Sequence, residues 1–266
     1  MTKAAYRCSL NTASCFGYCR RCDLIHTLPV GAAGKYVVDM MERLERLGRL
    51  DDTVPAEKAD PRLKFSALFD GRRGHMFGAM ECRSQEGKTT WIRAFSSLKG
   101  GIRWVKDWAP PILPKRLYDD LLVPGEAELV RLTAALEKQP SKDPEYTRLF
   151  KIRRALSQRL MAKMHASYRF RSLGGGIGGI DQAFLRDKPP GGVGECCAPR
   201  LLQWASMRKL EPVSIAEVYW GGTPPSESRR AGELYPCCES RCQPLMGFML
   251  CGGRYVQSRP ASTDDT

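Results

Sequence analysis

The residues best suited to chemistry in this sequence are the six cysteines that lie between Gly191 and Gly252. Cys238 and Cys242 are four positions apart, which places both sulfurs on one side of a helix start, and Cys196 precedes a separate helical run. Thiolates gathered in this way bind a divalent metal, and zinc is the ion that such sites prefer. We therefore predict a zinc site whose ligands come from Cys196, Cys197, Cys237, Cys238 and Cys242.

Two kinds of metal site fit this pattern. A closed site with a fourth sulfur from Cys197 or Cys237 would be structural and chemically inert. Zinc-dependent nucleobase deaminases instead place one ligand at a helix start, then a strand, then Pro-Cys-x-x-Cys at the next helix, so that metal-bound water attacks the base. The chain has this order of elements, but its spacing is Cys-x-x-x-Cys. No glutamate follows Cys196 by two residues, so Glu195 or Glu217 would have to carry the proton.

A second group of ligand-type residues lies near the N-terminus and comprises Cys8, Cys15, Cys19, Cys22 and His26. The spacing from Cys15 to Cys22 is also that of a radical-SAM iron-sulfur triad, but the strand-helix repeats that this enzyme class needs are not apparent. A small zinc knuckle and a set of free thiols are the two remaining interpretations. The chain has eleven cysteines, an odd number, which favours reduced thiols over a disulfide framework in a protein that is not secreted.

The cysteine-rich region resembles a known family. Residues 194–205 read GECCAPRLLQWA, followed by PVSIAEVYWG at 212–221 and by YPCC at 235–238 with the Cys-x-x-x-Cys spacing. These segments are similar to the accessory region that precedes the catalytic domain in large RluA-family RNA pseudouridine synthases. The segment HMFGAMECRSQEGKTTWIRAFSS at 75–97, with Pro110 and Pro111, is similar to an earlier part of that region. The resemblance implies a role in modifying tRNA or rRNA.

The catalytic domain of that family uses an aspartate nucleophile in a motif close to Arg-Leu-Asp-x-x-Thr-x-Gly. Residues 48–51 spell Gly-Arg-Leu-Asp, but Thr53 comes one residue early and Gly48 stands where the C-terminal cap of a helix belongs. Asp51 is therefore a weak candidate nucleophile, and a surface turn is the competing interpretation. Too few residues follow Gly252 to build such a domain downstream, so we expect the catalytic half to be missing.

Positive charge is concentrated in residues 151–171. The net charge is +13, and this run contains no acid. Ile152, Leu156, Leu160 and Met164 recur every four residues, which predicts an amphipathic helix that starts at Asp143-Pro144. Basic flanks on such a helix suit an RNA phosphate backbone, although a solvated face or a protein-partner surface would look alike. The predicted RNA-binding residues are Lys151, Arg153, Arg154, Arg159, Lys163, Arg169 and Arg171.

The elements that must position these residues predict an α+β fold. We expect a helix at 35–47, a hairpin at 76–96, a basic helical hairpin at 126–171, a helix at 199–208, a strand at 213–220 and a helix at 238–250. The predicted division is a Cys-rich segment at 1–34, an α+β region at 35–171, a Gly/Pro-rich linker at 172–194, a Cys-rich α+β domain at 195–252 and a disordered tail at 253–266.

The composition favours a globular protein with a substantial hydrophobic core and no membrane-spanning segment. Hydrophobic residues make up 42% of the chain, but no apolar run approaches the ~20 residues that span a bilayer. A cytoplasmic protein is the default expectation, and the basic, acid-free residues 1–22 are compatible with an organellar transit peptide.

The sequence thus predicts an RNA-binding accessory protein related to RluA-family pseudouridine synthases, with a structural cysteine zinc site. Such a protein would help to place RNA for a separate synthase. The alternatives are a zinc-dependent hydrolase resembling nucleobase deaminases and an active RNA pseudouridine synthase.

Overall fold

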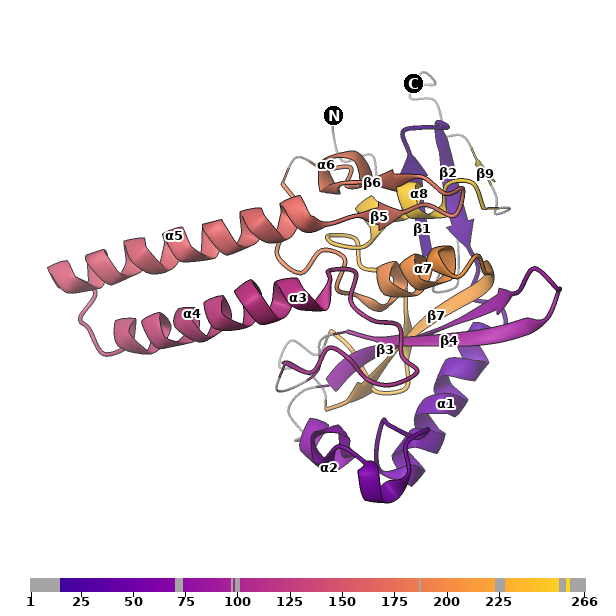
Figure 1. Ribbon diagram of the computed structural model, residues 1–266, viewed down its shortest axis with the longest axis horizontal. Helices are drawn as coiled ribbons and strands as arrows, with labels where there is room; N and C mark the ends of the chain where they lie inside the picture. Colours follow the sequence, from indigo (N-terminus) through magenta and orange to yellow (C-terminus); the bar gives the residue numbers. More distant parts are fainter. Residues whose placement is uncertain are drawn as a thin grey trace. The chain divides into compact units, whose positions relative to one another are not determined.

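A computed structural model describes residues 15–69, 74–96, 98, 101–186, 188–222, 228–253 and 257–258 of the chain. Its helices and strands (Figure 1) confirm the predicted α+β class. The chain divides into two compact units, one drawn from residues 1–112, 170–177 and 181–266 and the other from residues 113–169 and 178–180. We call the first the sheet unit and the second the hairpin unit.

The main sheet of the sheet unit has four antiparallel strands in the order β4-β3-β7-β8. β3 (Gly74–Arg83) and β4 (Thr89–Phe95) form the predicted hairpin, with Gly87 at a φ of 80° in its turn. β7 (Glu211–Gly221) covers the predicted strand and pairs with β3 along its length. β8 (Leu234–Tyr235) pairs with the other side of β7. β7 is therefore an interior strand.

Helices cover both faces of this sheet (Figure 1). Side chains alternate between the faces, so Phe77 and Ala79 of β3 share a core with α1 (Ala33–Leu47) on one side. On the other side, Gly78 of β3 lies against Cys197 and Leu201 of α7 (Cys197–Met207). A Cβ at Gly78 would meet the Cys197 side chain, so the missing side chain lets the start of α7 approach the sheet.

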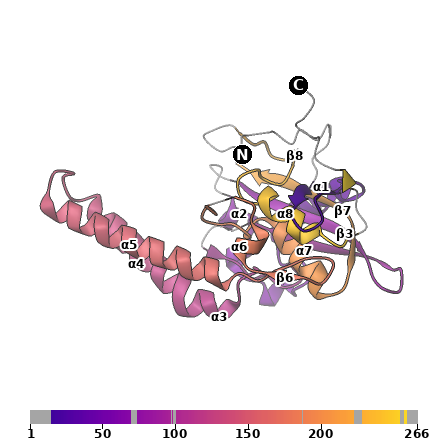
Figure 2. The same cartoon turned by 90° about the horizontal axis from the view of Figure 1, so that it is seen from above.

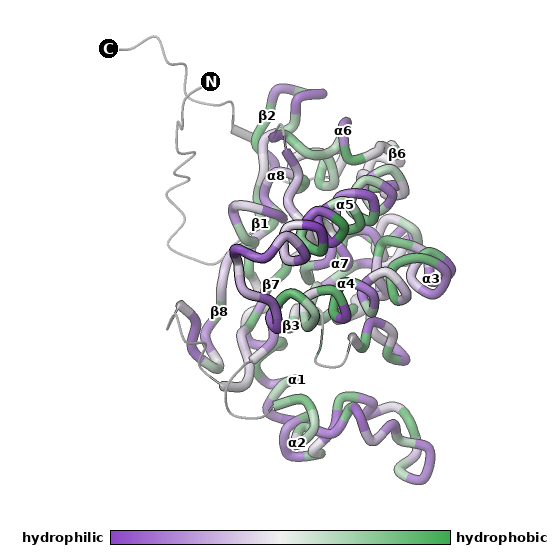
Figure 3. The backbone as a smooth tube through the Cα atoms, turned by 90° about the vertical axis from the view of Figure 1, so that its left-hand side faces the viewer, coloured by the Kyte–Doolittle hydropathy of each residue, from purple (hydrophilic) through white to green (hydrophobic). Residues whose placement is uncertain are grey.

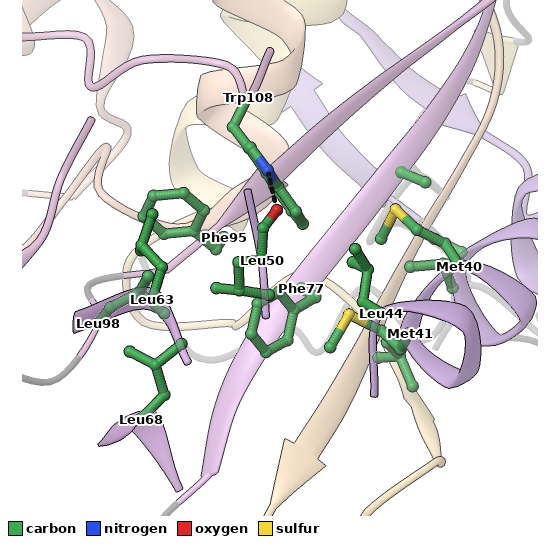
Figure 4. Close-up of a cluster of buried hydrophobic side chains, with 14 of the residues drawn as sticks. Met40, Met41, Leu44, Leu50, Leu63, Leu68, Phe77, Phe95, Leu98 and Trp108 are labelled. Atoms are coloured by element: carbon green, nitrogen blue, oxygen red, sulfur yellow. Dashed lines mark hydrogen bonds between the residues drawn. The ribbon is translucent and has the colours of Figure 1, made fainter. Parts of the chain in front are cut away.

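The core beneath the sheet explains why α1 ends where it does. Leu44 of α1 and Leu50 beyond it are both fully buried with Phe77 (Figure 4). Gly48 caps the helix with a left-handed φ of 76°, as its place in the sequence predicts, and turns the chain so that Leu50 enters the core. The indole N–H of Trp108 donates to the Leu50 carbonyl at 3.3 Å, which satisfies a buried polar pair.

Short elements complete this side of the unit. They are two 3-10 turns, η1 (Ala56–Lys58) and η2 (Pro61–Leu63), and the one-turn helix α2 (Phe65–Leu68).

A smaller sheet contributes the second part of the sheet unit. β1 (Cys15–Cys19) and β2 (Leu24–Leu28) form an antiparallel hairpin, and β9 (Gln257–Ser258) pairs with β2. α8 (Gln243–Leu250) lies directly against β1. A Cβ on Gly247 of this helix would overlap the Tyr18 carbonyl group, and a Cβ on Gly17 would overlap the backbone of α8. Two glycines therefore permit backbone-to-backbone contact between β1 and α8.

A two-stranded ladder of β5 (Phe170–Arg171) and β6 (Ile177–Gly178) precedes the one-turn helix α6 (Ile180–Ala183). β6 and α6 lie in the segment that the sequence predicts as a Gly/Pro-rich linker, and β5 lies just before it.

The hairpin unit contains the predicted helical hairpin (Figure 2). A short helix α3 (Lys115–Leu117) and a π-helical turn η4 (Tyr118–Leu122) lead into α4 (Val123–Leu136), and α5 (Pro144–Ser167) returns beside it. The Asp143 carboxylate accepts the Glu145 backbone N–H at 2.7 Å, which confirms the predicted start of α5. Of the predicted apolar stripe, only Leu160 is buried, against Gly125 of α4, while Ile152 is 42% exposed.

The predicted domain boundary at 172–194 differs from the division in the structure. β3 and β7 stand on opposite sides of that segment in the sequence, yet they are hydrogen-bonded neighbours in one sheet. The segment that separates as its own unit is instead the helical hairpin, and β1 and β2, predicted as part of an N-terminal segment, belong to the sheet unit. Long-range strand pairing leaves no local mark in the sequence. Most of the predicted tail at 253–266 lies outside the described residues, and residues 257–258 form β9.

Within the described residues, no helix combines the length and the apolar character that crossing a membrane requires.

The close contact between β1 and α8 can be tested by the sign of the stability change in a Gly247→Ala variant. Alanine is favoured over glycine in a helix interior by about 1 kcal/mol, so helix propensity alone predicts that Gly247→Ala stabilises the protein. We expect the opposite, a destabilisation of about 1–3 kcal/mol from overpacking, because the new methyl group meets the Tyr18 backbone. The urea midpoint of unfolding followed by circular dichroism measures this change, and an increased midpoint would contradict the close contact.

Candidate metal centre

Three cysteine side chains meet where α7 and α8 begin. Cys196 is the N-cap residue of α7 and Cys242 is the N-cap residue of α8, while Cys238 lies in the turn before α8. The Sγ atoms of Cys238 and Cys242 are 3.3 Å apart, and those of Cys196 and Cys238 are 4.0 Å apart. All three Sγ atoms lie within 4.8 Å of one another, a separation that allows all three to bind one metal ion.

The turn before α8 explains why two of these sulfurs converge. The backbone N–H groups of Cys242 and Gln243 both donate to the Cys238 carbonyl, at 3.1 and 3.0 Å, which forms a single helical turn. Residues four apart on such a turn share one side, so both side chains point the same way. Pro244 follows in the first turn of α8, where its missing N–H costs nothing. The predicted helix at 238–250 thus begins as a separate ligand-bearing turn.

The pKa directions differ among the three thiols. Hydrogen bonds with Cys196 and Cys242 lower the pKa of the Cys238 thiol to about 2, whereas the pKa values of Cys196 and Cys242 are raised well above the usual value, first by hydrogen bonds within the cluster. Cys238 is therefore the thiol of the three that ionises most readily. A divalent cation would favour loss of the proton from all three, because metal ligands must be deprotonated.

Glu217 of β7 stands beside this cluster and points to the same face of the sheet as α7. It pairs with Gly78 in the β3–β7 ladder, so its side chain lies on the face that α7 covers. The side chain is buried, and its Oε1 accepts the Ala198 backbone N–H at 3.0 Å. The pKa of Glu217 is raised to about 7, mainly by burial and also by the charge of Cys238, while the Ala198 N–H and the charge of Arg229 act in the opposite direction. Such a carboxyl group can both accept and release a proton near neutral pH.

A buried arginine fixes the helix that carries Cys196. Arg200 of α7 is fully buried, and its guanidinium donates to the carbonyl of Ala109 at 3.1 Å and also to those of Phe95 and Arg103. The group also lies over the Phe95 ring, 4.6 Å from its centroid. A buried charge with several carbonyl partners resists displacement, so the start of α7 is held in place relative to β4.

Two of the five predicted metal ligands lie outside the cluster. The Cys197 thiol is buried and donates to the Met76 carbonyl at 3.3 Å, and the Cys237 thiol is directed to the Phe16 carbonyl at 3.9 Å. Each is adjacent in sequence to a cluster member, and adjacent side chains point in different directions on both helices and strands. Within the described residues, a closed site of four sulfurs is therefore not assembled here.

The other predicted catalytic residues have different positions. Glu195 precedes Cys196, is half-buried and is outside the metal cluster. Asp51 is buried rather than part of a surface turn, and both of its carboxylate oxygens are engaged, by the Arg49 guanidinium at 3.2 Å and by the Asp60 backbone N–H at 2.9 Å. Those contacts hold the loop after α1 together, which gives Asp51 a structural role.

The predicted RNA-binding residues are divided between exposed and engaged side chains. Lys151, Arg154, Arg159 and Lys163 are exposed on α5. Figure 3 shows hydrophilic residues, in purple, along this helix. Arg153 instead donates to the Thr133 hydroxyl of α4 at 2.7 Å and so joins the two helices. Arg169 donates to the carbonyls of Ala166 and Tyr168, and Arg171 is half-buried in β5.

A second set of ligand-type side chains was only partly predicted. Cys19, Cys22, His26 and Cys251 also place one ligand atom each within 4.8 Å of the others. The sequence identified the first three as part of an N-terminal group, but nothing in it connects them to Cys251. Of the remaining members of that group, Cys15 is buried with its thiol 3.0 Å from the Met246 sulfur, and Cys8 lies outside the described residues. All described cysteines are free thiols.

Comparison with known proteins found no matching family model, no matching curated protein and no matching solved structure. The function of the protein is therefore inferred from the geometry of the site and from general chemistry.

The geometry predicts which cysteines retain metal. We expect the Cys238→Ser/Cys242→Ser double mutant to lose one equivalent of bound metal per chain, because two of the three clustered sulfurs are removed. The matched control Cys197→Ser is adjacent to a ligand but outside the cluster, and it should retain full occupancy. Metal content by plasma mass spectrometry measures both. Loss of metal from the control would restore Cys197 as a ligand.

Proposed function

We propose that this protein is a zinc-dependent hydrolase acting on a nucleobase, with zinc held by Cys196, Cys238 and Cys242 and with Glu217 as the proton carrier. One observation carries the proposal: three thiols converge, a buried carboxyl group is held at the start of the same helix by the N–H of Ala198, two residues after Cys196, and the described cluster contains no fourth sulfur. Structural zinc sites are closed by four protein ligands, whereas catalytic sites keep one position for water or substrate.

The chemistry that follows is a hydrolytic deamination. Zinc bound at such a site lowers the pKa of its water and supplies a nucleophile at neutral pH. Glu217 would accept a proton from the attacking water and pass it to the departing amino group. The carbon–oxygen bond forms, the carbon–nitrogen bond breaks, and ammonia leaves, so the base exchanges an amino group for an oxygen. The Ala198 N–H would hold the Glu217 carboxylate in place during both transfers.

Two features of the fold support this class of chemistry, and two depart from it. The order of α7, β7 and α8, with sulfur ligands at both helix starts, matches the order in zinc deaminases. Their three-cysteine variants show that thiolates alone can hold the metal. Here the glutamate comes from a strand rather than from the helix that carries the first ligand, and the second ligand pair is spaced Cys-x-x-x-Cys. The proposal is therefore for similar chemistry reached by a different placement of the carboxyl group.

RNA binding is a second candidate function, and the surface of α5 favours it. The run from Lys151 to Arg171 contains no acid, and four of its basic side chains are exposed on the helix. Lys and Arg side chains on an extended helix neutralise phosphates independently of sequence. The resemblance to the accessory region of RluA-family pseudouridine synthases points to the same partner. Under this proposal the protein binds tRNA or rRNA, and RNA is also the source of the base that the zinc site would act on.

The hydrolase proposal makes a prediction about Glu217. In the Glu217→Gln variant we expect zinc to be retained, because the cysteine ligands are unchanged, and deamination to fall about 100-fold or more, because general acid–base catalysis contributes ~10²–10⁴. The assay is ammonia release from cytidine- and adenosine-containing RNA, and Glu195→Gln is the matched control with near-normal activity. A wild-type protein that holds zinc but releases no ammonia from either RNA would remove this proposal.

The RNA proposal makes an independent prediction. Neutralising Lys151, Arg154, Arg159 and Lys163 to Gln should weaken RNA binding and reduce the salt dependence of the binding constant, by about 0.7 in logarithmic slope for each lost phosphate contact on single strands. Fluorescence anisotropy over a salt series measures the slope. The control removes the same charge from exposed positions of the sheet unit, namely Lys35, Arg46, Lys58 and Lys88. Equal loss in both proteins would show that only net charge matters.

A further inference from the structure

We infer a second zinc site, formed by Cys19, Cys22, His26 and Cys251, that fastens the β1–β2 hairpin to the C-terminal end of α8. The four side chains place one ligand atom each within 4.8 Å of all the others, and the Cys22 Sγ lies 3.0 Å from the His26 Nε2. Three sulfurs and one imidazole are a ligand set that zinc binds tetrahedrally. This inference does not depend on the proposed function.

The register of the hairpin places the first three ligands together. Directly opposed residues of an antiparallel pair share one face, and Gly17 is opposite His26 while Cys19 is opposite Leu24. Cys19 and His26 are therefore on the same face, with no side chain at Gly17 between the imidazole and the strand. Cys22 lies in the turn, where Asp23 adopts a φ of 56° and its N–H donates to the Cys19 carbonyl at 2.9 Å.

The fourth ligand comes from the other end of the described chain and is positioned by backbone hydrogen bonds. Cys251 follows α8 directly as its C-cap residue. Its carbonyl accepts the Gly174 N–H at 2.8 Å, and Gly252 then turns with a φ of 86°. A Cβ at Gly252 would overlap the Gly174 backbone, so these two chain segments are in direct contact at the site. These backbone contacts fix the position of Cys251 next to the β1–β2 hairpin.

The number of ligands separates this site from the one at the start of α8. Four protein ligands fill the tetrahedral shell of zinc and leave no position for water, so this second site is structural. The two clusters are linked through α8, because Cys242 is the N-cap residue of this helix and Cys251 is its C-cap residue. Zinc at the second site would therefore hold the helix whose N-cap residue, Cys242, belongs to the other cluster.

The proposal is tested by counting zinc in matched variants of the full chain. We expect two zinc ions per wild-type chain, one in Cys22→Ser/Cys251→Ser and one in Cys238→Ser/Cys242→Ser. Cys82 is buried in β3 outside both clusters, so Cys82→Ala should keep both ions. A wild-type chain with a single zinc that survives in the Cys22/Cys251 variant would overturn the second site and leave the proposed hydrolytic site standing.

The Cys22→Ser/Cys251→Ser variant could lose zinc because it misfolds, so a second measurement leaves the ligands of the second site unchanged. In the Cys238→Ser/Cys242→Ser protein, where only the second site remains, X-ray absorption should show three sulfurs and one imidazole nitrogen around zinc. Four sulfurs, or a shell without imidazole, would overturn the assignment, as would complete loss of zinc from this protein while its circular dichroism matches that of the wild type. Failure of the proposed function would appear separately, as absent ammonia release by a protein with two zinc ions.

Discussion

The pairing of β3 with β7 is the interaction on which the rest of the sheet unit depends. Its register sets Gly78 opposite Glu217 and Phe77 opposite Val218, so the carboxyl group faces α7 while the apolar side chains face α1. A slip of one residue would exchange these faces and place a carboxylate in the hydrophobic core. Burial of that apolar face, at roughly 1.5–3 kcal/mol for each large side chain, therefore also selects the register that forms the candidate centre.

The two cysteine clusters show how the same ligand type can serve different purposes. Each cluster brings three sulfurs within 4.8 Å of one another. The clusters differ in what completes the set. An imidazole closes the cluster at the β1–β2 hairpin, whereas a buried carboxyl group with a pKa near neutrality adjoins the cluster at the start of α8. A ring nitrogen stabilises a fixed shell, and a titrating carboxyl group supports proton transfer.

Local features of the sequence predicted the local features of the structure. The Gly48 cap, the Asp143 start of α5, the β3–β4 hairpin and the contact between Cys238 and Cys242 all depend on residues close together or on simple periodicity. Cys196 is more distant in the sequence and was proposed from its place at a helix start. What the sequence could not supply depends on distant pairing. The predicted boundary at 172–194 differs from the units of the structure because β7 returns to β3, and Cys251 was missed because its partners are distant in the sequence.

The sequence pattern also could not predict the direction in which individual side chains point. Cys197 and Cys237 are chemically equivalent to their neighbours, and only the backbone decides which member of each pair faces the cluster. Asp51 lies in a polar segment that resembles an exposed turn, but Arg49 and Asp60 provide it with buried partners. Glu217 was one of three candidate carboxyl groups, and the strand register alone separates it from the others.

The return of β7 to β3 across the hairpin unit has a consequence for biosynthesis. β3 and β4 leave the ribosome before the helical hairpin is made, and β7 follows only afterwards. At ~5–20 residues per second the delay is on the order of ten seconds, during which one edge of β3 has no strand partner. Folds dominated by such non-local contacts form slowly, so the nascent protein has an extended period of vulnerability to aggregation. A longer delay separates His26 from Cys251, so a zinc ion captured early by the hairpin would wait for its last ligand until α8 has been made.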